Sequence, residues 1–179
     1  MHSIRVVDFD FKPYLEGKHL CLRPLAKGDF DTLFSVAKDP HIWAQHPIKD
    51  RYKKTKFTEY FCDAMDSNSA LIAIDSKTHN VIGSSRFHAY SRKKSEVEIG
   101  WSFLARPYWG GVYNGEMKNL MLKHAFQYVE NVVFIIGIHN LRSQKATKKI
   151  GGILSEEENQ QGESDNVIYH INRADYFHE

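Results

Sequence analysis

Cysteines are few in this sequence, and their positions exclude two common kinds of small domain. Only Cys21 and Cys62 occur, they lie far apart, and the ten histidines are scattered. No paired-cysteine or His-x-x-x-His spacing is present, so we expect neither a disulfide framework nor a metal site. Both cysteines are expected to be buried free thiols in a reducing cytosol.

Long apolar runs and an excess of one charge are also missing. No apolar run approaches the length of a membrane span, and residues 1–12 lack the apolar core of a signal peptide. The chain has 24 Lys and Arg against 22 Asp and Glu, a formal net charge of +2, whereas nucleic-acid-binding proteins usually carry a basic excess. The sequence therefore predicts a cytoplasmic protein whose partners include neither a membrane nor a nucleic acid.

What the sequence does contain is typical of a single globular domain, residues 1–179. Apolar residues make up 42% and charged residues 26%, and no repeat or long linker divides the chain. Apolar spacing predicts helices at 29–38, 54–66, 114–129 and 141–150. It predicts strands at 19–23, 71–74, 81–90, 96–104, 132–138, 152–154 and 167–172. We expect an α/β (α+β) fold, a mixed and mostly antiparallel sheet of about seven strands flanked by about four helices.

Two local motifs follow the central strands. Gly110 and Gly111 form a turn before a helix for which Asn114 is the candidate N-cap. The first N–H groups of a helix lack partners within it, so this turn either binds an anion or only starts a core helix. In the second motif, Asn140 and Ser143 open a basic helix, where Asn140 is either a ligand-binding amide or a helix cap.

The element order and four segments of sequence resemble the GNAT superfamily of N-acetyltransferases, in particular its branch of ribosomal-protein N-terminal acetyltransferases. The segments are LEGKHLCLRPLAKGDFDTLF (15–34), VEIGWSFL (97–104), PYWGGVYNGEMKNLMLKHAF (107–126) and NLRSQKATKKIGG (140–152). The resemblance, strongest over 15–152, implies an acyl-CoA-dependent N-acyltransferase that moves acetyl from acetyl-CoA to a primary amine by direct attack. The alternative is a non-catalytic protein that binds or senses acyl-CoA on the same scaffold.

The resemblance also implies which residues bind coenzyme A. The pyrophosphate is expected on the glycine turn, and the pantetheine arm and phosphates on the helix after the next strand. The implied residues are Leu104, Gly110, Gly111, Val112, Tyr113, Asn114, Gly115, Asn140, Ser143 and Lys149. The turn departs from the family pattern at Trp109, Val112 and Asn114, where the family has Arg or Gln, then Gly, then Gly or Ala. We therefore expect weak coenzyme binding.

Acetyl transfer to an amine needs a base, a hydrogen-bond donor for the oxyanion and a proton for the departing thiolate. Strand alternation places Val97, Ile99, Trp101 and Phe103 on one face, and Glu96, Glu98, Gly100 and Ser102 on the other. GNAT enzymes often carry a base on this strand, so Glu98 is our first candidate and Glu96 our second; two solvent-facing glutamates are the alternative. The resemblance implies an oxyanion donor near the Leu104 N–H. Ser143 or water is expected to protonate the thiolate, because Thr147 stands where many GNAT enzymes have tyrosine.

The amine is expected to bind against the loop 41–51. Trp43 offers an apolar wall and His46 a group that titrates near neutrality, with local packing as the alternative. The acceptor stays open between a small molecule and a protein N-terminus. The oligomeric state stays open between a monomer and a homodimer.

Overall fold

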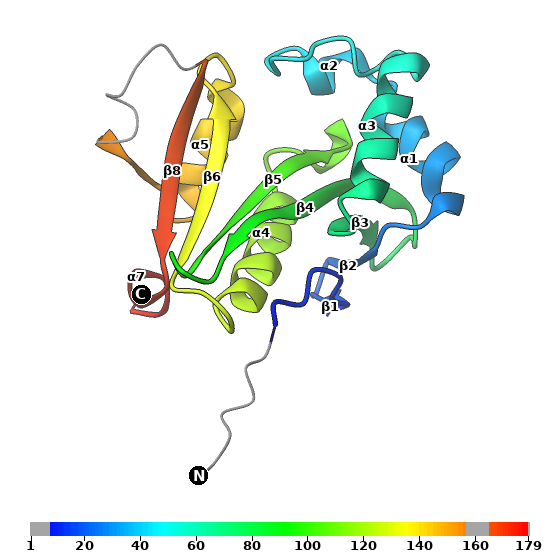
Figure 1. Cartoon of the computed structure of the whole chain (residues 1–179). Coiled ribbons are helices and arrows are strands. Elements are labelled where there is room, and N and C mark those ends of the chain that lie inside the picture. Colours follow the sequence, from blue (N-terminus) through cyan, green and yellow to red (C-terminus); the bar gives the residue numbers. More distant parts are fainter. Residues whose placement is uncertain (1–7, 157–164, 179) are drawn as a thin grey trace.

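The computed structural model describes residues 8–156 and 165–178, which form one mixed sheet with helices on both faces (Figure 1). The strand order is β1-β2-β3-β4-β5-β6-β8-β7, and every neighbouring pair is antiparallel except the parallel pair β5 and β6. The strands are β1 (Leu15–Glu16), β2 (Leu20–Pro24), β3 (Ala70–Asp75), β4 (Val81–Ser91), β5 (Glu96–Leu104), β6 (Asn131–Gly137), β7 (Ile153–Leu154) and β8 (Asn166–Asn172). The helices are α1 (Phe30–Ala37), α2 (Pro40–Trp43), α3 (Lys54–Asp66), α4 (Val112–Ala125), α5 (Leu141–Lys149) and α7 (Arg173–Phe177), with 3₁₀ turns η1 (Lys27–Asp29) and η2 (Arg106–Tyr108).

The sheet separates two hydrophobic cores, and each core is covered by helices with an apolar stripe. On one face α4 buries Met117, Met121 and Ala125 against Val97 and Ile99 of β5. On the other face α1 and α3 bury a second set of apolar side chains against β3 and the end of β5. That second set includes Leu33, Phe57, Phe61, Ile72 and Phe103. Site residues on β5 can therefore face either α4 or α3.

The sheet opens between its two central parallel strands. β5 and β6 pair only from Glu96–Asn131 to Glu98–Val133. Beyond these residues the strands diverge, as Figure 1 shows, and we call the space that follows the β5–β6 opening. Backbone groups of a strand edge in such an opening have no sheet partner, so they are free to bind a ligand.

A β-bulge in β5 changes the side-chain alternation that the sequence predicts. Gly100 lies opposite Arg86 while Phe103 lies opposite Ser84, so β5 has one extra residue between these pairs. Trp101 takes up the change with a φ of 51°. The prediction that Trp101 and Phe103 share a face with Val97 and Ile99 is therefore wrong, because Phe103 packs in the α3 core.

Glu116, near the start of α4, holds the turn between β1 and β2. Its carboxylate accepts the backbone N–H groups of Lys18, His19 and Leu20 at 2.8, 2.7 and 2.9 Å. A Cβ on Gly17 would lie 2.7 Å from the Glu116 carboxyl carbon, so the turn closes around this side chain. The contact joins the quoted segments 15–34 and 107–126.

The predicted fold class and the antiparallel character of the sheet are confirmed, with small differences in the elements. The described residues contain eight strands and six helices, because β1, α2 and α7 are short elements that weak patterns conceal. The α4 helix begins two residues before the predicted start and has Gly111, not Asn114, as its N-cap. Cys62 is exposed and Cys21 half-buried, so the expectation of two buried thiols is wrong. No helix in the described part of the chain has the length and apolarity to cross a membrane.

Candidate functional site

Glu98 lies on β5 at the last position where β5 pairs with β6, at the narrow end of the opening. Only 8% of the residue is exposed. Burial raises the pKa of its carboxyl to about 7, although the nearby Arg86 cation opposes the rise. A carboxyl group with this pKa can take a proton from an amine near neutral pH.

Gly100 leaves room beside this carboxylate. A Cβ built on Gly100 would lie 3.0 Å from Glu98 Oε1, so the carboxylate leans over the space that a side chain would fill. Glu96 lies two residues earlier, half-buried and opposite Asn131 where the strands are still paired. Of the two predicted candidates, Glu98 is thus the one that borders the β5–β6 opening.

The end of β5 supplies backbone groups to the opening. The N–H of Ala105 donates to the carbonyl of Ile82 on the β4 side. Successive backbone groups of a strand alternate in direction, so the N–H and C=O of Leu104 point toward the open side. The Leu104 carbonyl accepts the Trp109 indole N–H at 2.8 Å, and its N–H faces the opening as the predicted oxyanion donor requires.

The loop from η2 to α4 presents its turn to solvent. Gly110 has a φ of 71°, and Gly110 and Gly111 are both exposed. Val112 is the first helical residue and 54% of it is exposed, so a helical backbone with a solvent-facing side chain replaces the glycine of the family pattern. Tyr113 donates its hydroxyl to Asp75 at 3.3 Å, and Asn114 and Gly115 are half-buried in the first turn.

The second motif opens α5, on the other side of the opening. The Asn140 side chain accepts the Ser143 N–H at 3.2 Å, which confirms Asn140 as the helix cap. Ser143 is half-buried and Lys149 is exposed. Thr147, at the position of the family tyrosine, is buried, and its Cγ2 would lie 2.6 Å from a Cβ on Gly152.

Arg142 contacts residues on both sides of the opening. Its guanidinium lies 3.9 Å from the Trp109 ring centroid and donates to the carbonyl of Ile42 at 2.8 Å. Its backbone N–H donates to the Gln45 side chain at 3.0 Å. The loop before α4, the start of α5 and the α2 segment therefore have fixed relative positions.

Trp43 and His46 lack the properties that we expect of substrate-binding residues. Trp43 is 3% exposed, donates its indole N–H to the Ala37 carbonyl at 2.7 Å and packs on Phe103, as the local-packing alternative requires. His46 accepts the Ile48 N–H through Nδ1. Burial, and next the Arg51 cation, lower the pKa of His46 to about 4, so the prediction that it titrates near neutrality is wrong.

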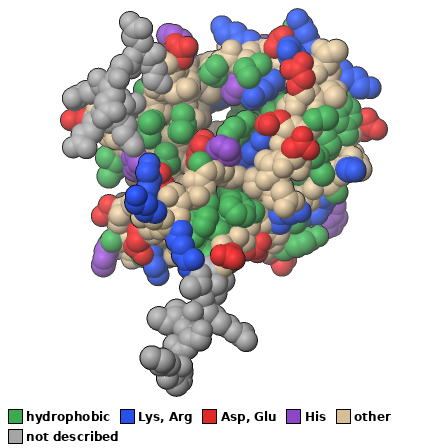
Figure 2. Space-filling view, in the orientation of Figure 1, with side chains coloured by type: hydrophobic (Ala, Val, Ile, Leu, Met, Phe, Trp, Pro, Cys, Tyr) green, Lys and Arg blue, Asp and Glu red, His purple; other side chains and the backbone are tan. Residues whose placement is uncertain are grey.

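Three cationic side chains near β5 were missed by the sequence analysis. Arg51 and Arg86 are buried on the α3 face, and Lys118 is buried on the α4 face. Each lies in an amphipathic or unpatterned segment where lysine and arginine usually face solvent, so no sequence signal marks them. Figure 2 shows the molecule hollowed between the α2–α3 side and the β6–β8 side, with charged and histidine side chains around the hollow.

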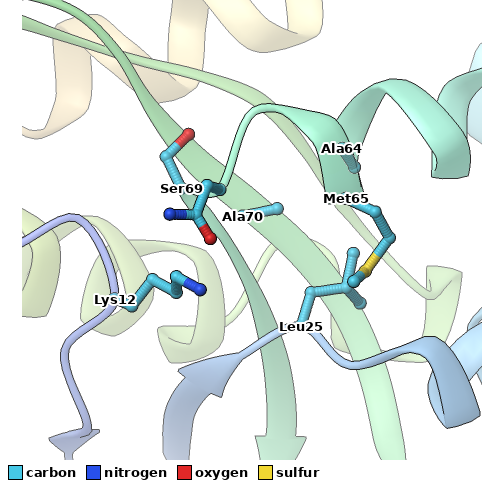
Figure 3. A pocket seen from close by; sticks show the side chains of 7 residues that line it. Lys12, Leu25, Ala64, Met65, Ser69 and Ala70 are labelled. Carbon is cyan, nitrogen blue, oxygen red and sulfur yellow. The ribbon is translucent and has the colours of Figure 1, made fainter.

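A second concavity lies away from these residues (Figure 3). It is lined by Lys12, Leu25, Ala64, Met65, Asn68, Ser69 and Ala70, at the end of α3 and the start of β3. No predicted site residue and no buried base is among its lining residues, so we do not assign chemistry to it. In the described part of the chain no three His, Cys, Asp or Glu side chains are grouped to hold a metal.

Comparison with known proteins agrees with this geometry. The acetyltransferase (GNAT) domain model matches residues 19–153, while no curated protein sequence matches. A probable GNAT-family acetyltransferase from Chromobacterium violaceum ATCC 12472 is 14% identical, with a TM-score of 0.81 over 100% of this chain and 95% of that one. Spermidine N-acetyltransferase from Vibrio cholerae, solved with CoA and spermine, is 15% identical, with a TM-score of 0.67 over 90% and 99%.

Ribosomal-protein-S5-alanine acetyltransferase from Vibrio fischeri is 14% identical, with a TM-score of 0.68 over 92% of this chain and 99% of that one. At these identities the similarity of the structures establishes the fold. The family model covers most of the chain, including the strands on both sides of the β5–β6 opening and the glycine loop. The chain therefore belongs to the GNAT acetyltransferase family.

Proposed function

We propose that the protein is an N-acetyltransferase that moves acetyl from acetyl-CoA to a primary amine, with Glu98 as the base. The observation that carries the proposal is a buried carboxyl group with a pKa of about 7 at the edge of the β5–β6 opening. Because Gly100 has no side chain, the carboxylate can lean over the strand, with Oε1 3.0 Å from where a Cβ would lie. Burial of a carboxylate that no cation hydrogen-bonds is costly, and groups with perturbed pKa values cluster at functional sites.

Acetyl-CoA binds across the opening in this proposal. Its pyrophosphate meets the exposed turn Gly110–Gly111 and the first N–H groups of α4, where the helix dipole favours an anion. The pantetheine arm lies along the edge of β5 toward Leu104. Its far phosphate meets the start and basic face of α5, from Asn140 to Lys149.

The reaction is a direct attack. The amine nitrogen forms a bond to the acetyl carbon, the C–S bond breaks, and Glu98 accepts the proton that the amine loses. The Leu104 N–H stabilises the oxyanion, and the departing thiolate takes up a proton to give free coenzyme A. The cytoplasm as the place of action, and a monomer or homodimer as the assembly, stay predictions from the sequence.

Two measurements on the purified protein test this proposal. We expect coenzyme A to raise the melting temperature in a concentration-dependent way, because a ligand that binds only the folded state stabilises it. We expect release of free thiol from acetyl-CoA to accelerate on addition of a mixed panel of primary amines. Stabilisation without amine-dependent thiol release would identify a non-catalytic acyl-CoA-binding protein, and no effect of millimolar coenzyme would exclude both.

A further inference from the structure

Arg86 is a buried cation with two donors that lack acceptors. Its side chain is 2% exposed, and Nη1 donates to Asp63 Oδ2 at 2.8 Å. Nε and Nη2 are buried without any hydrogen-bond partner. Asp63 itself is 66% exposed at its side chain, so the ion pair holds one edge of the guanidinium and leaves the other unsatisfied. Unpaired buried donors are costly, and a binding site is a common reason for a protein to keep them.

Aromatic rings fix this guanidinium in place. The Trp101 ring centroid lies 4.5 Å from the guanidinium carbon of Arg86, and the Tyr60 centroid lies 5.4 Å from it. The Tyr60 hydroxyl donates to the Trp101 carbonyl at 3.1 Å, which holds the bulge of β5 against α3. The guanidinium carbon of a second buried cation, Arg51, lies 5.0 Å from the centroid of the Tyr60 ring. The two arginines therefore sit around one tyrosine in a position that packing defines.

The base lies beside this pair of cations. Arg86 is directly opposite Gly100 in the β4–β5 register, and Glu98 leans over the space at Gly100. Glu98 is close enough for the Arg86 charge to oppose the rise in its pKa. An amine placed at Glu98 over Gly100 would thus have its neighbouring atoms next to the strand position that carries Arg86.

We propose that the acceptor is an amine with a carboxylate a few bonds away, as in an amino acid, and that Arg86 binds this carboxylate. The inference rests on the proposed function. A carboxylate supplies the acceptor oxygens that Nε and Nη2 lack, in the planar geometry that a guanidinium recognises. A polyamine fits poorly, because an amine held at Glu98 would bring its further ammonium groups toward Arg86 and Arg51.

Acceptor specificity tests the proposal. Each of a set of amino acids is compared with its own carboxamide and with spermine, and kcat/KM is measured by thiol release from acetyl-CoA. We expect amino acids to exceed their carboxamides by about 10- to 100-fold, as charge-assisted hydrogen bonds allow. Arg86→Met should remove this preference chiefly through KM, and Arg86→Lys should restore part of it. Arg173→Met, at an exposed surface pair, is the matched control.

The outcomes separate this inference from the proposed function. Faster turnover with spermine than with any amino acid would overturn the carboxylate site while leaving the acetyltransferase intact. Equal loss of activity with amino acids and carboxamides in Arg86→Met would show that Arg86 only supports the fold, provided that coenzyme A still raises the melting temperature of the variant. If no amine accelerates thiol release in the natural protein, the proposed function fails first.

Lys118 is buried on the α4 face of β5. Its ammonium donates to the Ser102 hydroxyl and lies 5.4 Å from the Phe134 ring centroid. Ser102 is on β5 and Phe134 on β6, both beyond the last paired residues, so the amine lies inside the β5–β6 opening. Ser102 is exposed, and its hydroxyl is 2.7 Å from that of Ser85. Burial lowers the pKa of Lys118 to about 7.

We infer that Lys118 donates the proton to the thiolate of coenzyme A when the C–S bond breaks. This inference also rests on the proposed function. The N–H proton passes to sulfur, the lysine becomes a neutral amine, and solvent protonates it again through the exposed Ser102 side. A lysine whose ammonium is made more acidic by burial transfers its proton to a thiolate readily.

The leaving group gives a test that a structural role would not satisfy. Lys118→Met should lower kcat with acetyl-CoA by about 100-fold, near the lower end for loss of a general acid. With acetyl thioesters whose thiols have a pKa several units below that of coenzyme A, the loss should shrink to less than about 10-fold, since such thiolates leave unprotonated. A loss of equal size with every thioester would overturn the inference, and a coenzyme-induced rise in the melting temperature of Lys118→Met checks that the variant is folded.

Discussion

Glu98→Gln is expected to lower the turnover number by about two to four powers of ten while leaving the affinity for coenzyme A unchanged. Glutamine has nearly the same shape but cannot accept the amine proton. The variant should therefore bind the coenzyme and fail in the chemical step. Steady-state thiol release measures the turnover, and calorimetry measures the dissociation constant of coenzyme A.

The dependence of the rate on pH is a second test of Glu98 as the base. Burial raises the pKa of Glu98 to about 7, and the base works only when it is deprotonated. The rate of the natural protein should therefore rise with pH up to about 7, and the residual rate of Glu98→Gln should lack that rise. Above about 7 the rate should fall as Lys118, the acid inferred above, loses its proton, and in Lys118→Met it should level off instead. Glu96→Gln, two residues away on β5, is the matched control. Full activity of Glu98→Gln together with loss in Glu96→Gln would assign the base to Glu96.

The local sequence was sufficient to predict most elements but not the geometry of β5. The periods of residues 54–66 and 96–104 gave the limits of α3 and β5, because each segment has a strong one-sided or alternating pattern. The bulge at Trp101 has only a weak local signal, the glycine at position 100, and the pattern does not tell which residue takes the positive φ. The bulge turns Ser102 toward Lys118 and brings Trp101 over Arg86, so it decides which side chains surround the base.

The candidate site was predictable where its residues depend on local structure and not where they depend on long-range contacts. Glu98, the glycine turn and Asn140 occupy recognisable positions in strands, turns and helix starts. The unsatisfied edge of Arg86 depends on α3, which is distant in sequence, through Asp63 and Tyr60. Charged residues are usually solvent-exposed, so nothing short of the packed structure distinguishes this arginine from a surface one.

Glu116→Ala is expected to lower the free energy of unfolding by about 3 kcal/mol. The substitution removes three charge-assisted hydrogen bonds, so the backbone donors of the β1–β2 turn lose their acceptors. For a domain of this size, that loss corresponds to a fall of about 6–12 °C in melting temperature. Gly17→Ala should act in the same direction, since its Cβ would collide with the Glu116 carboxyl group.

Glu59→Ala provides the control for this stability prediction. Glu59 pairs with Lys56 on the surface of α3, where both side chains are well exposed, and such pairs contribute less than about 1 kcal/mol. Urea unfolding of the three variants beside the natural protein measures the differences. Equal stabilities of Glu116→Ala and Glu59→Ala would show that the β1–β2 turn finds other acceptors, and that α4 keeps its position without the carboxylate that joins it to the first strands of the sheet.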